Sequence, residues 1–197
     1  MLASPKFLIR RTVMSRILLA SAAAAIVVVL AGALAIRSFA ADNGPVPQVG
    51  QAAPTFTLPS QEGTPVSLDE YKGKWVVVYF YPKDMTPGCT REAHEFQNDL
   101  EKYKAANAVI LGVSVDSVDS HKQFCAKDSL NFTLLSHADK KLISQYGSLG
   151  NYGPVQIAKR NTFLIDPSGK IAKVWTGVDP AQASSEVLTA LNELEKH

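Results

Sequence analysis

A continuous run of β-branched and aromatic residues at positions 75–81 (WVVVYFY) constrains the fold more than any other feature of the chain. Seven such residues without a polar break predict a strand buried on both faces, as in the middle of a sheet that is covered by helices. A second run of this kind follows at 108–114 (AVILGVS). Because 46% of the residues are hydrophobic, the chain can also cover such a sheet. The sequence therefore predicts an α/β domain with a buried central sheet.

Helical patterns alternate with these strands. Apolar residues at helical spacing predict helices over residues 87–104, 118–127, 139–146 and 180–194. Shorter extended segments are expected at 132–135, 162–165 and 171–176, the last two joined by a turn at 166–169 (DPSG). Strand–helix alternation favours parallel strands with right-handed crossovers, and the late hairpin adds antiparallel strands. We expect a mixed central β-sheet with helices on both faces.

The N-terminal segment differs in composition from the rest. Residues 1–41 contain five basic residues and no acidic one, and residues 17–36 form an apolar run of 20 that only Ser21 and Gly32 interrupt. A cationic stretch before such a run is typical of an export signal peptide or a single membrane anchor. Four of the basic residues precede the run, so the N-terminus should stay cytoplasmic. The body is then expected to be exported, as a periplasmic protein or one anchored facing the periplasm, with membrane contact only through this segment.

The sequence after residue 41 predicts a linker followed by one domain. Residues 42–55 are rich in Pro and Gly, which predicts a linker, and the folded domain is expected over residues 47–197. Residues 42–197 contain 15 basic and 18 acidic residues, a net charge of −3. With no basic stripe and no nucleic-acid-binding motif, the sequence predicts no nucleic-acid partner.

The residues suited to chemistry lie where the first buried strand ends and a helix begins, at 81–92 (YPKDMTPGCTRE). Active sites of α/β sheets lie at the carboxyl ends of strands. Pro87 suits the start of a helix, so Cys89 falls in the first helical turn. There the positive end of the helix and its free N–H groups favour a thiolate. Thr86 lies three residues before the sulfur and can place its hydroxyl close to a bound oxygen.

Pro82, Thr86 and Cys89 have the spacing of a known motif. It resembles the active-site motif of peroxiredoxins, and the wider string YPKDMTPGCTREA is similar to the subfamily named for bacterioferritin comigratory protein. The resemblance extends over roughly residues 47–195. It implies a thioredoxin-like fold and a thiol peroxidase that reduces hydrogen peroxide and organic hydroperoxides, with the Cys89 thiolate as the attacking group.

The same resemblance implies roles for three further residues. Arg160 corresponds to the active-site arginine of the family, and a guanidinium favours a thiolate and offers several donors to peroxide oxygens. Glu92 corresponds to a glutamate of the site's hydrogen-bond network, and Pro82 shapes the loop. Further implications are that the electrons come from thioredoxin or a similar thiol–disulfide donor and that the protein is a monomer. Because the sequence has no dinucleotide, haem or zinc motif, we expect no bound cofactor or metal.

The second cysteine decides how the oxidised enzyme is resolved. Many members of the subfamily carry a cysteine five residues after the first, but here that position is His94. Other members place it on a later helix, and Cys125 lies 36 residues after Cys89 within the predicted helix 118–127. We expect Cys125 to be the resolving thiol in an intramolecular disulfide, which would require local unwinding. Two alternatives stay open: an inert Cys125 in a one-cysteine peroxidase, or a static structural disulfide.

Two other classes of protein are compatible with parts of the sequence. A disulfide oxidoreductase on the same fold would carry a Cys-x-x-Cys pair, which this sequence lacks. An exported redox-sensing or thiol-exchange module would not need Thr86 and Arg160 together with Cys89. Sustained peroxide consumption would distinguish the enzyme from this module.

Overall fold

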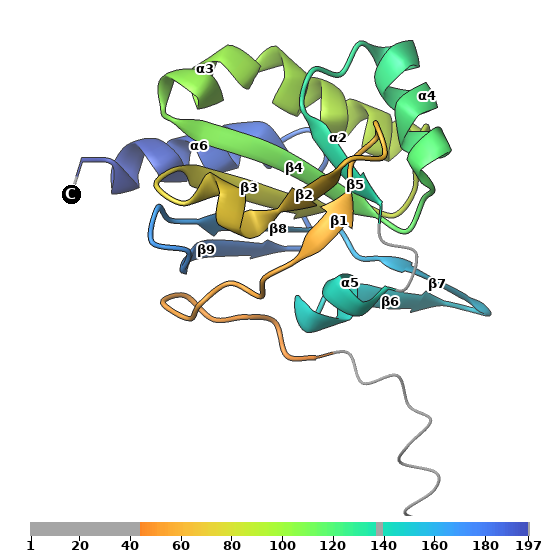
Figure 1. Ribbon diagram of the computed structural model, residues 1–197, viewed down its shortest axis with the longest axis horizontal. Helices are drawn as coiled ribbons and strands as arrows, with labels where there is room; N and C mark the ends of the chain where they lie inside the picture. Colours follow the sequence, from red (N-terminus) through yellow and green to blue (C-terminus); the bar gives the residue numbers. More distant parts are fainter. Residues whose placement is uncertain (1–43, 137–139, 197) are drawn as a thin grey trace, which may run out of the picture. The chain divides into compact units, whose positions relative to one another are not determined.

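A five-stranded mixed sheet forms the centre of the computed structural model, which describes residues 44–136 and 140–196 (Figure 1). Its strand order is β5-β4-β3-β8-β9. Strands β3, β4 and β5 run parallel, whereas β8 is antiparallel to β3 and β9 is antiparallel to β8. The strands span Trp75–Phe80 (β3), Ala108–Ser114 (β4), Thr133–Ser136 (β5), Asn161–Ile165 (β8) and Ile171–Thr176 (β9). The predicted mixed sheet is thus confirmed.

Strand β3 lies in the middle of this sheet, and its side chains contribute to two separate hydrophobic core layers, one on each face. Its odd-numbered residues, such as Val77 and Tyr79, point to one face, and Val76, Val78 and Phe80 point to the other. All five are at most 2% exposed. A strand buried on both faces explains why the 75–81 run carries no polar residue.

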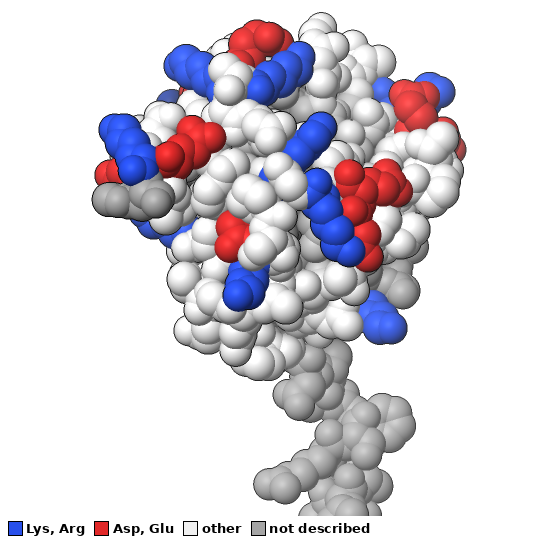
Figure 2. All heavy atoms as spheres, turned by 60° about the vertical axis from the view of Figure 1, so that its left-hand side comes forward, with Lys and Arg blue, Asp and Glu red and all other residues white. Residues whose placement is uncertain are grey.

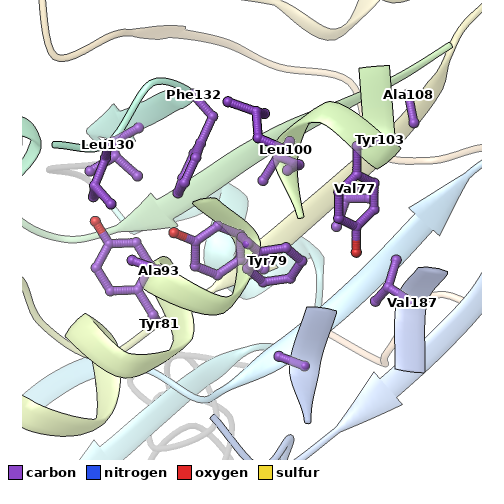
Figure 3. Packing of buried hydrophobic residues seen from close by; sticks show 14 of the residues in the cluster. Val77, Tyr79, Tyr81, Ala93, Leu100, Tyr103, Ala108, Leu130, Phe132 and Val187 are labelled. Carbon is purple, nitrogen blue, oxygen red and sulfur yellow. The ribbon is translucent and has the colours of Figure 1, made fainter. Parts of the chain in front are cut away.

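Helices cover the Tyr79 face of the sheet (Figure 1). Figure 3 shows Tyr79 of β3 and Tyr81, the residue after β3, pointing into this layer, where Ala93, Leu130 and Phe132 lie near them. The ring of Phe96 stacks on Tyr79 with a centroid distance of 4.7 Å. The helices of this layer are α2 (Pro87–Asn98), α3 (Leu100–Ala105), α4 (Val118–Asp128) and α6 (Ala183–Leu194).

Smaller elements cover the opposite face. Leu142, Ile143 and Tyr146 pack there against Phe80 and Phe163 of the sheet. The elements of this layer are α5 (Lys141–Gln145), the hairpin of β6 (Leu149–Tyr152) and β7 (Val155–Ala158), the hairpin of β1 (Thr57–Pro59) and β2 (Pro65–Ser67), and the 3-10 helix η1 (Leu68–Tyr71).

Several boundaries differ from the sequence-based predictions. The helix predicted over 87–104 is two helices, because the chain turns at Asp99, whose carboxylate accepts hydrogen bonds from Lys102 and Ser184. The β1–β2 and β6–β7 hairpins were not predicted. The helix predicted over 139–146 is observed as Lys141–Gln145, and residues 137–139 lie outside the described residues.

The predicted linker is partly integrated into the domain. Within residues 44–55, the Gly50 N–H donates to Ile171 O at 2.8 Å, the Ile171 N–H donates to Gln51 O at 2.8 Å, and the Ala53 N–H donates to Gly169 O at 2.9 Å. This stretch therefore pairs with the edge strand β9 instead of linking freely, an interaction that Pro and Gly content alone does not reveal.

The predicted signal peptide or anchor, residues 1–41, lies outside the described residues. Within 44–136 and 140–196, no helix is both long enough and apolar enough to cross a membrane.

On the face of the molecule drawn in Figure 2, Lys and Arg side chains lie next to Asp and Glu in small mixed groups.

Candidate active site

The loop that carries the motif leaves the carboxyl end of β3. The Tyr81 N–H still donates to Val113 O of β4 at 3.1 Å, and Pro82, which has no N–H, ends the pairing. Met85 then adopts a left-handed backbone conformation with φ of 57°. Such a conformation is uncommon for a residue with a side chain and is found disproportionately at functional loops. The turn directs the chain into α2.

Helix α2 begins so that Cys89 lies in its first turn. Thr86 is the N-cap, with extended backbone, and Pro87 is the first helical residue. The early N–H groups of a helix have no intrahelical acceptor, so this end carries partial positive charge. The Thr86 hydroxyl donates to Lys83 O at 3.0 Å, which leaves its lone pairs as acceptors. Cys89 itself is only 2% exposed.

Arg160, the residue immediately before β8, reaches Cys89 from the strand next to β3 in the sheet. Phe80 at the end of β3 pairs with Asn161 at the start of β8. Arg160 therefore lies beside the carboxyl end of β3, the end from which the chain continues to α2. Arg160 Nη2 donates to Cys89 Sγ at 3.4 Å, and Nη1 donates to a carboxylate oxygen of Glu92. The guanidinium thus bridges Cys89 and Glu92, which lie 1 turn apart on α2.

Glu92 is a buried carboxyl group, and within the described part of the chain only one of its two oxygens accepts a hydrogen bond. It is 0% exposed, and its Oε1 has no hydrogen-bond partner among the described residues. Burial raises the pKa of Glu92 to about 7, against the opposing effect of the Arg160 charge. For Arg160, burial acts to lower the pKa, but Glu92 and Cys89 outweigh it, so the pKa rises above its ordinary value. Arg160 therefore stays charged beside the sulfur.

The backbone around Arg160 is fixed by buried polar contacts. Asn161 is 3% exposed; its side-chain amide donates to Ser148 Oγ at 3.0 Å and accepts from the Gly177 N–H at 3.2 Å. The Val178 N–H donates to Arg160 O at 3.0 Å. An open hollow of about 420 Å³ next to Arg160 is lined in part by Tyr152 and Val178.

Cys125 lies on α4, and both cysteines are free thiols. Its partly buried side chain packs against the core layer that contains Cys89. Burial raises the pKa of Cys125 to about 11, with smaller contributions from the charges of Asp84 and Glu62. In this arrangement Cys125 is held as a protonated thiol.

A buried polar cluster beside the loop was missed by sequence reasoning. Asp84, in the loop before Cys89, accepts hydrogen bonds from Tyr81 and Ser120 and contacts His121 of α4. The one signal in the sequence was that His121 lies four residues before Cys125, which places the two residues on one face of the same helix. Among the described residues, no group of three or more His, Cys, Asp and Glu side chains could hold a metal ion.

The fold and the site together define a class of protein. A mixed sheet flanked by helices, a cysteine at a helix N-terminus beyond a central strand, and an arginine donating to its sulfur are the features expected of thiol peroxidases with a thioredoxin-like fold. The sequence profile of the AhpC/TSA family matches residues 49–174, and the chain belongs to this family.

Within the family, the chain is a peroxiredoxin of the Bcp and Q type. It is 40% identical over 153 residues to peroxiredoxin Bcp of Bacillus subtilis (strain 168), covering 76% of this chain and 98% of that protein. It is 43% identical over 148 residues to the chloroplastic peroxiredoxin Q of Sedum lineare, covering 74% of this chain and 78% of that protein. The predicted resemblance is therefore confirmed.

Solved structures agree with this assignment. The structure of peroxidoxin BcpB from Mycobacterium tuberculosis superposes with a TM-score of 0.71 at 30% identity, covering 75% of this chain and 98% of that one. The bacterioferritin comigratory protein of Xanthomonas campestris, studied for its alkyl peroxide reduction activity, superposes with a TM-score of 0.68 at 38% identity, covering 71% and 91%. The thioredoxin-like peroxiredoxin fold of the domain is thus established.

Proposed function

We propose that this peroxiredoxin reduces hydrogen peroxide and organic hydroperoxides through Cys89. The Cys89 thiolate attacks one peroxide oxygen, an S–O bond forms, and the O–O bond breaks. The leaving oxygen takes a proton and departs as water or an alcohol, and Cys89 becomes a sulfenic acid. The observation that carries this proposal is the donation from Arg160 Nη2 to Cys89 Sγ at the N-terminus of α2.

Arg160 and Thr86 have complementary tasks in this step. Arg160 favours the thiolate and then stabilises the negative charge that develops on the leaving oxygen, together with N–H groups of the first turn. Because the Thr86 hydrogen is engaged with Lys83 O, its oxygen is suited to accept the O–H of the incoming hydroperoxide. Pro82 shapes the loop, and Glu92 fixes the orientation of Arg160.

The hollow beside Arg160 supports the inclusion of organic hydroperoxides among the substrates, since its Tyr152 and Val178 can contact an alkyl group. Alkyl peroxide reduction is also the activity studied in the Xanthomonas campestris relative.

Cys125 resolves the sulfenic acid in this proposal. Its thiol displaces the Cys89 hydroxyl, which gives an intramolecular disulfide and water. Two solved structures of the Xanthomonas campestris peroxiredoxin Q carry single cysteine-to-serine substitutions at positions 36 residues apart, the separation of Cys89 and Cys125 here. A thiol with a pKa of about 11 is a poor nucleophile, so α4 must first move Cys125 into water. The same raised pKa favours the alternative, an inert Cys125 in a one-cysteine enzyme.

The reductant and the location complete the proposal. Thioredoxin or a similar dithiol protein supplies two electrons to the disulfide, and the protein acts as a monomer. The N-terminal segment directs export, so that the body works on the periplasmic side, either released or anchored. Protease treatment of intact spheroplasts tests the location, because an exported body is digested and a cytoplasmic one is protected.

Steady-state peroxide consumption tests the activity. With excess dithiothreitol, the purified protein should consume many equivalents of hydrogen peroxide, and Cys89→Ser should consume none. Replacing dithiothreitol with thioredoxin, thioredoxin reductase and NADPH tests the donor class. Consumption that stops near one equivalent per protein despite excess reductant would instead identify a redox-sensing module.

A further inference from the structure

A buried polar cluster joins the Cys89 loop to the helix that carries Cys125. Asp84 Oδ1 accepts from the Tyr81 hydroxyl at 2.6 Å, and Oδ2 accepts from the Ser120 hydroxyl at 2.6 Å. His121 Nδ1 lies 2.8 Å from the same Oδ2. Asp84 is 4% exposed and His121 is 0% exposed. We call Tyr81, Asp84, Ser120 and His121 the α4 latch.

The charge state of Asp84 determines which atoms of this cluster donate hydrogen bonds. Burial acts to raise the pKa of Asp84, but the hydrogen bonds and charge of His121, with Ser120 and Tyr81, outweigh it and leave the pKa lowered. Asp84 is therefore a carboxylate, which only accepts. His121 Nδ1 must donate to it, and the His121 Nε2 atom has no partner among the described residues. Two of the three donors to this buried carboxylate, Ser120 and His121, belong to α4, so hydrogen bonds to a charged group attach the helix to the loop.

Other contacts hold α4 only weakly. Among its residues only His121 and Phe124 are fully buried, whereas α6 buries six side chains. At the other end of α4, His94 of α2 lies 3.1 Å from Asp128, but the His94 side chain is 47% exposed. Helices with little apolar burial open at a low free-energy cost. The latch therefore contributes a large share of what keeps α4 on the domain.

We propose that Asp84, Ser120 and His121 are positioning residues for the resolving step, and that their release sets how fast Cys125 reaches the oxidised Cys89. Ser120 and His121 lie within five residues of Cys125 on the same helix, and Asp84 lies in the loop five residues before Cys89. Opening the latch frees the first turns of α4 and carries Cys125 away from the Asp84 charge. This inference rests on the proposed role of Cys125.

The latch then decides between two fates of the sulfenic acid. When α4 detaches, the Cys125 thiol displaces the hydroxyl and releases water, which forms the disulfide. While α4 stays docked, a second hydroperoxide can oxidise the sulfenic acid to a sulfinic acid and leave as an alcohol or water. A firm latch lengthens the exposure of the sulfenic acid to that second oxidation.

Rapid-quench mass spectrometry of the full-length protein tests this inference. Ser120→Ala removes one donor, and His121→Phe keeps a ring but removes the Nδ1 donor. Both should form the Cys89–Cys125 disulfide about tenfold faster than wild type, because a hydrogen bond to a charged group contributes about one such factor. Both should form the sulfenic acid at the wild-type rate and accumulate less sulfinic acid in excess hydrogen peroxide. His121→Asn, whose amide can donate from the Nδ1 position, should restore slow resolution.

Two controls separate the latch from general destabilisation. Gln123→Ala changes an exposed residue of α4, and Val187→Ala truncates a buried residue of α6; neither should accelerate disulfide formation. Hydrogen exchange of the reduced proteins should be faster at Val118–Asp128 in the two latch variants only. Unchanged disulfide rates in the latch variants, or equal acceleration by Val187→Ala, would overturn the latch alone. A wild type that never forms the disulfide would overturn the role of Cys125.

Discussion

At the scale of single residues, Arg160 combines two contacts that no other cation could make at once. Its two terminal nitrogens reach Cys89 and Glu92 separately, which requires the planar fork of a guanidinium. A lysine has one terminal nitrogen and cannot span both partners.

Arg160→Lys should therefore impair the first step although it preserves charge. We expect the second-order rate of sulfenic acid formation to fall about 10-fold to 100-fold in Arg160→Lys and about 100-fold to 1,000-fold in Arg160→Met. Stopped-flow kinetics with hydrogen peroxide measures both. Wild-type rates in Arg160→Lys would show that charge alone suffices.

Thr86 is expected to act through its oxygen. Thr86→Ser keeps the hydroxyl and should retain most of the peroxide reaction, whereas Thr86→Val keeps the shape and should lose about 100-fold, as for other oriented polar groups in active sites. The same stopped-flow measurement applies. Equal activity of the serine and valine variants would reduce Thr86 to a helix-capping residue.

Glu92 should make stability depend on pH in an unusual direction. Its pKa is raised in the folded state to about 7 from an ordinary 4.5, so the folded protein binds the proton more tightly than the unfolded chain. Its contribution to the free energy of unfolding is therefore full below pH 4.5 and is lost as pH rises through 7.

In Glu92→Gln this contribution disappears. Between pH 5 and 7, the stability of wild type relative to the variant should fall by at most ~1.4 kcal/mol per pH unit. Urea denaturation at several pH values measures the difference. Parallel curves for the two proteins would contradict the raised pKa.

At the scale of elements, the helices on the Tyr79 face differ in how firmly they are attached. Helix α2 buries Ala93 and Phe96 next to Cys89 and Glu92, so the proposed attacking residue lies on a firmly packed helix. Helix α4 buries only His121 and Phe124 fully, and its Ser120 and His121 contact Asp84 of the loop. This difference agrees with the proposed mechanism, in which Cys89 stays in place and Cys125 moves to it.

Phe96→Ala should show how much the packing of α2 matters to stability. Phe96 is 0% exposed and stacks on Tyr79, so its truncation should lower the free energy of unfolding by about 3–5 kcal/mol. Phe96→Leu, which leaves a smaller cavity, should cost less. Chemical denaturation compares the three proteins, and a loss below about 1 kcal/mol for Phe96→Ala would contradict the packing described.

The elements that could be predicted from the sequence are those with strong periodicity. The runs at 75–81 and 108–114 became β3 and β4, and the DPSG turn joins β8 to β9. The β6–β7 hairpin escaped prediction because Asn151, Tyr152 and Val155 are exposed and give no alternation. At the break, Asp99 accepts a hydrogen bond from Ser184, which is 85 residues away and so contributes nothing to a local sequence pattern.

At the scale of the whole molecule, the residues of the candidate site could be predicted from the sequence, whereas the polar contacts around them could not. Cys89, Thr86 and Arg160 were singled out by motif, and the antiparallel pairing of β3 with β8 brings Arg160 to the sulfur. The Asp84–His121 contact could not be predicted, since the two residues are 37 positions apart and the spacing of His121 relative to Cys125 does not point to Asp84. Buried polar pairs of this kind become visible only when the loop and α4 are both in place.

Intact mass spectrometry after one equivalent of hydrogen peroxide tests the central claim most directly. We expect wild type to lose the mass of two hydrogens through a Cys89–Cys125 disulfide, and Cys125→Ser to gain one oxygen on Cys89. A wild type that gains oxygen and forms no disulfide would contradict resolution by Cys125 and favour a one-cysteine enzyme. If Cys89 stays unmodified in both proteins, its role as the peroxide-attacking thiolate is wrong.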